Sequence, residues 1–256
     1  MPAVLYEKRG KTAYVTINRP EKLNAINYEV RAGLLESWEK VNKDPDVWSV
    51  IITGAGEKAF SAGADMEKTA EFRENEPTAD LPLNTESTFG ADVMKPIIGA
   101  INGYCVGAGF LLSFYCDIRV ASENAKFGLP ECKRGIVSGH GLNIKVANYF
   151  PTGIAAEMLL LGELFDAQKA YHFGYVNKVV PQTDLMSAAE TVAWKINNLS
   201  PLVMKNIKSC YKVGAGISPQ SIEFNDTMAR MIRYSEDYKE GINAFAQKRT
   251  PVWKGK

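Results

Sequence analysis

The chain has 256 residues, of which 46% are hydrophobic and 23% charged, and its formal net charge is +1. This length can bury the core of one domain with an appendage. The balanced charge gives no support for binding nucleic acid or an anionic membrane surface, and no apolar run approaches the ~20 residues of a membrane span. No basic stretch followed by an apolar one opens the chain, so we expect no signal peptide and a cytoplasmic protein.

The first quarter of the chain predicts two strands, a helix and a third strand. Residues 4–8 and 12–18 are predicted to be strands joined by a Gly-Lys turn, which is a hairpin signal. Residues 28–42 carry apolar side chains at helical spacing: Val30, Leu34, Leu35, Trp38 and Val41. Residues 48–53 form the next predicted strand. Strands and helices alternate afterwards, which indicates an α/β fold.

A polar segment, residues 68–92, interrupts this alternation. It contains Pro77 and Pro82, shows little periodicity, and is long for a connection inside a compact domain. Two interpretations stay open: a mobile loop or wall of a binding site, or a solvated helix and loop.

The stretch 96–131 is the part of the sequence that most strongly indicates a reactive site. A predicted strand, 96–101, is followed by Gly103, Gly107 and Gly109, a helix over 110–115 and a strand over 117–121. A glycine turn before a helix start gathers unpaired N–H groups, which suit an anion or a carbonyl oxygen that becomes one. The loop 58–67 follows another strand and offers a second donor. The alternative is a buried turn whose glycines serve only packing.

The remainder of the chain is mostly helical. After a glycine turn over 135–141 we predict helices over 142–149, 154–161 and 167–173, a strand over 177–180, and a helix over 185–197. Ser200-Pro201, Ser218-Pro219 and Ser235 are typical starts of three further helices. One of these has a predicted buried stripe of Ile222, Phe224, Met228, Met231 and Ile232. This tail has more apolar surface than its own small core can cover.

The cysteines give no sign of a metal or disulfide framework. Cys105, Cys116, Cys132 and Cys210 have no CxxC spacing, so we expect reduced, mostly buried thiols. No zinc-type ligand spacing, Rossmann fingerprint or P-loop is present. The sequence therefore predicts no metal site and no resident cofactor.

Four blocks together resemble the crotonase family, the enoyl-CoA hydratase/isomerase superfamily. They are NRPEKLNA at 18–25, FSAGAD at 60–65, NGYCVGAGF at 102–110 and FGLPE at 127–131, in family order within a resemblance from about residue 5 to 253. The resemblance implies a crotonase-type ββα spiral core over 1–195 and a C-terminal helical oligomerisation region over 196–256. It also implies a homotrimer or a dimer of trimers, a hexamer.

The resemblance further implies how an acyl-CoA thioester is bound. The thioester oxygen would lie between the backbone N–H groups of Ala64 and Ala108. The substrate and CoA side would lie along Lys22, Leu23, Ala25, Ala62, Asp65 and Met66. Phe245 and Lys248 match positions where a neighbouring subunit touches the CoA phosphates, although a C-terminal lysine is more often only solvated. Coenzyme A would be the substrate carrier, with no other cofactor.

The acid and base groups depart from the two-glutamate pattern of family hydratases. Leu111 stands where the first glutamate is expected, and Glu131 stands at the second. A carboxyl held among apolar groups has a raised pKa and can act as base and then as acid. One glutamate suits double-bond isomerisation, and some family hydratases also work with one. His140 could contact the acyl group or be structural.

We therefore expect an enzyme that hydrates or isomerises enoyl-CoA thioesters through Glu131. Two alternatives remain: a protein that binds CoA thioesters without turnover, and a related reaction on a cyclic or aromatic acyl-CoA.

Overall fold

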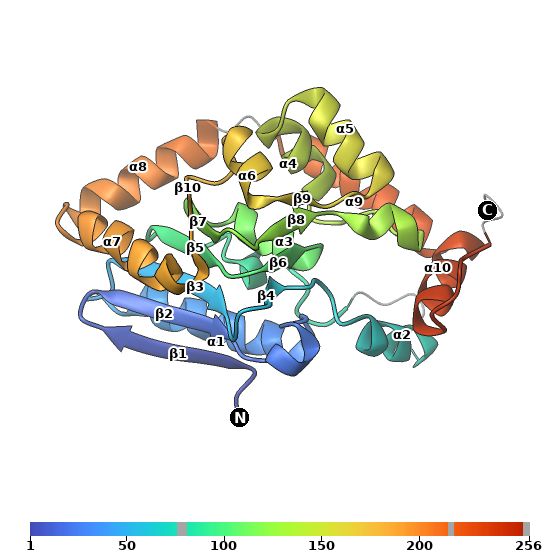
Figure 1. The fold of residues 1–256 in the computed structure, drawn as a ribbon, viewed down its shortest axis with the longest axis horizontal. Coiled ribbons are helices and arrows are strands. Elements are labelled where there is room, and N and C mark those ends of the chain that lie inside the picture. Colours follow the sequence, from blue (N-terminus) through green and yellow to red (C-terminus); the bar gives the residue numbers. More distant parts are fainter. Residues whose placement is uncertain (76–80, 215–217, 253–256) are drawn as a thin grey trace.

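The structure, a computed structural model, describes residues 1–75, 81–214 and 218–252. Its larger sheet has six strands, parallel except for the antiparallel β1–β2 hairpin (Figure 1). In spatial order they are β1 (Val4–Arg9), β2 (Thr12–Ile17), β3 (Ser49–Gly54), β5 (Ile97–Ile101), β7 (Ile118–Ser122) and β10 (Lys178–Val180). The predicted strands of the first half are confirmed to within one or two residues at each end.

A second, four-stranded sheet was not predicted from the sequence. It consists of β4 (Ala59–Ser61), β6 (Tyr104–Val106), β8 (Lys126–Gly128) and β9 (Phe165–Asp166). After each of β3, β5 and β7 the chain enters a strand of this second sheet and then a helical segment. This repeated strand–strand–helix order is the expected ββα spiral. The predicted direct passage from strand to helix at residues 102–110 is wrong, because β6 lies between them.

Helices surround the two sheets. They are α1 (Tyr28–Lys43), α2 (Met66–Asn75), α3 (Ala108–Phe114), α4 (Leu142–Tyr149), α5 (Thr152–Leu161), α6 (Ala167–His172), α7 (Leu185–Asn197), α8 (Pro201–Gly214), α9 (Pro219–Arg233) and α10 (Glu236–Ala246). The expected cap of α10 is confirmed, since Ser235 accepts from the Tyr238 amide, and Asp166 caps α6 by accepting from the Lys169 amide. In the predicted α9 stripe, the side chains of Phe224, Met228 and Met231 lie outside the described residues.

Short 3₁₀ segments complete the fold: η1 (Pro20–Lys22), η2 (Glu86–Phe89), η3 (Pro130–Arg134) and η4 (Gln182–Asp184). The polar segment 68–92 thus contains most of α2 and all of η2, while residues 76–80 lie outside the described part. Both interpretations of this segment hold in part, because α2 is largely exposed and Leu81, Leu83 and Phe89 line a cavity.

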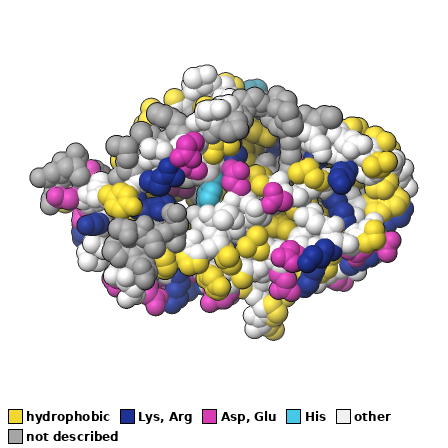
Figure 2. All heavy atoms as spheres, turned by 180° about the vertical axis from the view of Figure 1, so that it is seen from behind, with side chains coloured by type: hydrophobic (Ala, Val, Ile, Leu, Met, Phe, Trp, Pro, Cys, Tyr) yellow, Lys and Arg dark blue, Asp and Glu magenta, His cyan; other side chains and the backbone are white. Residues whose placement is uncertain are grey.

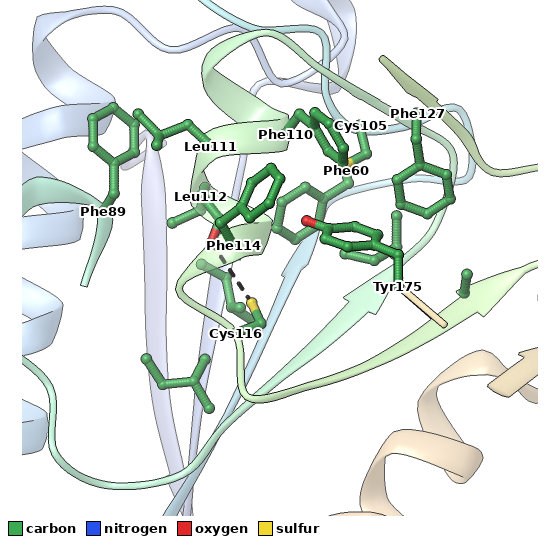
Figure 3. Packing of buried hydrophobic residues seen from close by; sticks show 14 of the residues in the cluster. Phe60, Phe89, Cys105, Phe110, Leu111, Leu112, Phe114, Cys116, Phe127 and Tyr175 are labelled. Carbon is green, nitrogen blue, oxygen red and sulfur yellow. Dashed lines mark hydrogen bonds between the residues drawn. The ribbon is translucent and has the colours of Figure 1, made fainter. Parts of the chain in front are cut away.

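The core fixes α3, the helix that begins at the glycine turn. Phe110 packs edge-on against Tyr175 with ring centroids 5.1 Å apart (Figure 3). The Ser113 and Tyr175 hydroxyls are hydrogen-bonded at 2.6 Å. Further rings from β8, β9 and the end of α4 join this cluster: Phe127, Phe150 and Phe165. Aromatic packing of this kind stabilises the position of α3 against the second sheet.

A separate apolar cluster joins α7 to the other face of the larger sheet. Ile51, Ile98 and Val120 pack there with Leu185 and Ala189. The C-terminal helices are also anchored by a buried ion pair, since the Lys208 Nζ of α8 lies 2.6 Å from the Asp117 carboxylate.

The surface carries charges of both signs. On the face that Figure 2 shows, basic and acidic side chains are interspersed with apolar ones. Across the described ranges, the structure contains no helix long and apolar enough to cross a membrane. Cys105 and Cys116 are buried free thiols and Cys132 is an exposed one, which agrees with the expectation of mostly buried thiols. The Cys210 side chain lies outside the described residues.

Candidate active site

One cavity of about 710 Å³ brings together all but one of the predicted site residues. It is lined by Lys22, Leu23, Ala25, Ala62, Ala64, Asp65, Met66, Ala108, Leu111, Glu131, His140 and Phe245. Lys248 follows α10 and is not part of this lining. These residues come from separate stretches of the chain, 22–25, 62–66, 108–111, 131–140 and 245.

Two backbone N–H groups in this cavity are free to bind an oxygen. Ile26 accepts from the Asp65 amide at 3.0 Å and donates to the Gly63 carbonyl at 2.8 Å, which leaves the Ala64 amide between them unused. Ala108 is the first residue of α3, so its amide has no partner within the helix. Among the hydrogen bonds of the described residues, neither amide is a donor.

Glycines bring these two amides together. Gly107 has φ +57°, a left-handed conformation that glycine adopts at little cost. A Cβ on Gly109 would lie 2.5 Å from the Ser61 carbonyl oxygen, so only glycine lets α3 approach β4 this closely. The two loops are therefore close together. A Cβ built on Gly63, the residue before Ala64, would lie only 3.5 Å from the Ala108 nitrogen. The arrangement has the features of an oxyanion hole with one donor from each loop.

The Glu131 carboxyl adjoins the same turn. It stands in η3, directly after β8, and its Oε1 lies 3.0 Å from where a Cβ on Gly107 would be. Its Oε2 is buried with no hydrogen-bond partner, the only such carboxylate oxygen among the described residues. Burial raises the pKa of Glu131 from about 4.5 to about 7, against smaller lowering effects of its own backbone N–H, Arg134 and Ser138. Near neutral pH this group can therefore both accept and donate a proton.

The other carboxylates of the cavity already have partners. Asp65 is paired with Arg19 at 2.9 Å and also caps the start of α2. Glu67 is paired with Lys22 at 2.9 Å. Asp226 accepts a hydrogen bond of 3.3 Å from the Gly141 amide. Asp65 thus links the segment at Arg19 to the start of α2.

Part of the cavity wall is apolar. Leu111 from α3 is only 3% exposed and, like Phe89 from η2, lines the cavity (Figure 3). The His140 ring lies 5.6 Å from the Phe89 ring, and burial lowers the pKa of His140 below its usual value near 6.5. A neutral imidazole at this place in the cavity can donate one hydrogen bond and accept another from a substrate.

Several lining residues were not predicted from the sequence, among them Arg31, Phe89, Arg134 and Ser138. A signal existed for Arg31, because it precedes Leu34 and Trp38 at helical spacing and so shares the apolar face of α1. Ser138 lies in a loop, where no periodic pattern marks it.

Phe245 lies in the cavity of its own chain. Its ring contacts the Arg134 guanidinium, whose Cζ lies 4.6 Å from the ring centroid. Its place in the cavity therefore needs no neighbouring subunit.

Comparisons with known proteins agree with this geometry. The family described as enoyl-CoA hydratase/isomerase matches residues 7–256. Over 100% of both chains, the sequence is 37% identical to an (E)-benzylidenesuccinyl-CoA hydratase of Thauera aromatica. Over 97% of both chains, it is 37% identical to a carnitinyl-CoA dehydratase of Salmonella enteritidis.

Solved structures show the same likeness over the whole chain. A carnitinyl-CoA hydratase from Mycobacterium avium has a TM-score of 0.87 and 34% identity, with 100% of both chains covered. An enoyl-CoA hydratase from Bacillus anthracis has a TM-score of 0.77 and 29% identity, with 99% of this chain and 100% of that chain covered. The chain belongs to the enoyl-CoA hydratase/isomerase family and has its crotonase-type fold.

Proposed function

We propose that this enzyme adds water to 2-enoyl-CoA thioesters, and removes it in the reverse reaction, with Glu131 as the single acid and base. The observation that carries this is the buried, unpartnered Glu131 Oε2 beside the free Ala64 and Ala108 amides. The names of the relatives, which are hydratases and dehydratases of CoA thioesters, support hydration.

The geometry supports a simple proton path. Glu131 takes a proton from water while the water oxygen bonds to C3, and the electron pair of the double bond moves onto the thioester oxygen. The Ala64 and Ala108 amides stabilise the resulting enolate. Glu131 then delivers the proton to C2, which returns the carboxylate to its starting state. Because one carboxyl serves both steps, hydrogen and hydroxyl add to the same face.

Isomerisation is the second candidate, and Leu111 favours it. With an apolar residue at this position, Glu131 is the one carboxylate in the described lining of the cavity that has a buried oxygen without a hydrogen-bond partner. The same carboxylate could take a proton from C2 of a 3-enoyl thioester and return it to C4. No water enters the product in that reaction.

Product analysis by mass spectrometry decides between the two. Incubation with crotonyl-CoA should give a product heavier by one water, and 3-hexenoyl-CoA should stay unconverted. A mass-neutral conversion of 3-hexenoyl-CoA to its conjugated isomer, with crotonyl-CoA unchanged, would establish isomerisation instead. No conversion of either would contradict the proposal for simple acyl groups and direct attention to cyclic or aromatic ones.

We expect the pH dependence of hydration to report the Glu131 carboxyl. The reaction begins with the carboxylate, so kcat/KM should rise about tenfold per pH unit below pH 7 and level off above it. The measurement is kcat/KM from about pH 5.5 to about pH 8.5 in one buffer system. A flat profile over this range would assign the proton transfer to another group.

The remaining expectations stay proposals. Coenzyme A enters as the carrier of the substrate, no other cofactor takes part, and the protein is cytoplasmic. Residues 1–195 form the catalytic core and 196–256 the association region of a trimer. Exposed apolar side chains on α7, α8 and the turn between them support association: Trp194, Leu199, Leu202, Val203 and Ile207. A sedimentation mass of a single chain would contradict the trimer.

A further inference from the structure

Arg31 is a buried cation that has no counter-ion among the residues that the structure describes. It projects from α1, is 4% exposed, and lines the same cavity as Glu131. One hydrogen bond is present, from Nη1 to the Pro82 carbonyl at 3.2 Å, while Nε is buried without a partner. Among the described residues no carboxylate pairs with it, and burial alone lowers its pKa to about 10.

Such an arrangement is costly unless it serves binding. A buried guanidinium without an anion loses its hydration and gains no ion pair that would compensate for this loss. Two other carboxylates are paired with other cations, since Asp65 of the cavity lining is paired with Arg19, and Glu86 is paired with Lys145 at 2.7 Å. The charge of Arg31 also contributes to the lowered pKa of His140, which places both groups in one region of the cavity.

We propose that Arg31 binds a carboxylate on the acyl group, so that the preferred substrates are mono-CoA thioesters of unsaturated dicarboxylic acids. This rests on the proposed function, because it names the substrate class of the same site. A guanidinium presents several N–H donors in one plane and binds a carboxylate through two parallel hydrogen bonds. Leu83, Phe89 and Leu111 give the cavity an apolar wall for the intervening carbon chain.

Binding of saturated thioesters tests this without any reaction. Adipoyl-CoA and hexanoyl-CoA share the CoA part and the chain length and differ at the far end, where one has a carboxylate. Calorimetry with the wild-type protein should give at least ~10-fold tighter binding of adipoyl-CoA, the size expected for a hydrogen-bonded ion pair. Equal affinities would overturn the proposal.

Variants then identify the residue responsible. In Arg31→Met the preference for adipoyl-CoA over hexanoyl-CoA should be lost, and Arg31→Lys should keep part of it. Lys68→Met is the matched control, because Lys68 on α2 is 62% exposed and does not line the cavity; it should keep the full preference. Should Arg31→Met weaken both ligands equally, Arg31 would contact the CoA part and the proposal would fail. Where Arg31→Met does not fold, the wild-type comparison and Arg31→Lys decide.

Rate measurements distinguish a failure of the carboxylate-site proposal from a failure of the proposed function. The rates to compare are those of hydration of 2-hexenedioyl-CoA and 2-hexenoyl-CoA. Hydration of both with equal kcat/KM would keep the function and overturn the carboxylate site. Tighter binding of adipoyl-CoA without hydration of either would keep the carboxylate site and overturn the function.

Discussion

Glu131→Gln is expected to lower kcat for hydration by about 10²- to 10⁴-fold, the usual contribution of a positioned acid or base. Glutamine has nearly the same shape but cannot exchange a proton at neutral pH. Because the Ala64 and Ala108 amides are untouched, the affinity for hexanoyl-CoA should change by less than about threefold. Steady-state kinetics and calorimetry on the same preparation measure the two effects.

A matched control is Glu163→Gln. Glu163 is 64% exposed and paired with Lys133, which lies in the same 3₁₀ segment as Glu131. This variant should keep the activity of the wild type. Undiminished turnover in Glu131→Gln would show that another group moves the proton.

Glu131→Gln should also stabilise the fold at high pH. In the native state the pKa of Glu131 is raised to about 7, whereas the unfolded chain has its ordinary value near 4.5. The unfolded state therefore ionises first, and stability falls as the pH rises from about 4.5 to about 7. Above that range the cost reaches roughly 3 kcal/mol, and Glu131→Gln should recover most of it. Urea unfolding at about pH 8 should show the gain and at about pH 5 only a small part of it.

The larger sheet could be predicted because each of its main strands is a five- or six-residue run with a clear apolar pattern. The second sheet could not. Its strands have two or three residues, too few for an alternating pattern, and they are held by pairing between distant segments such as β6 and β8. Periodicity within a single segment carries no information about such pairing.

Some residues of the candidate site could likewise be predicted from the sequence, and others could not. Glu131, Leu111 and the two proposed amide donors could be assigned positions in the chain because the blocks around them resemble those of the crotonase family. Arg31 was not predicted because an apolar stripe at helical spacing marks only its apolar members as buried, and arginine side chains are mostly exposed. Burial of Arg31 depends on η2 and the residues before it, which cover α1 from a distant part of the sequence.

Ala108→Pro is expected to remove one of the two oxyanion donors while leaving α3 in place. Proline is tolerated at the first position of a helix, where its missing N–H has no partner in any case. The preceding Gly107 has φ +57° and ψ −123°, outside the right-handed helical region that a following proline disfavours. Loss of one donor should lower kcat by about 10²- to 10³-fold.

Circular dichroism and the affinity for hexanoyl-CoA show whether the variant keeps its fold and its CoA site. Ala108→Gly retains the N–H and changes only the side chain, so its kcat should stay far above that of Ala108→Pro. A folded Ala108→Pro enzyme with kcat within about threefold of the wild type would mean that this amide does not hold the enolate oxygen. The rate would then depend on the Ala64 amide and Glu131 alone, and the convergence of α3 on the Gly63 loop would serve packing.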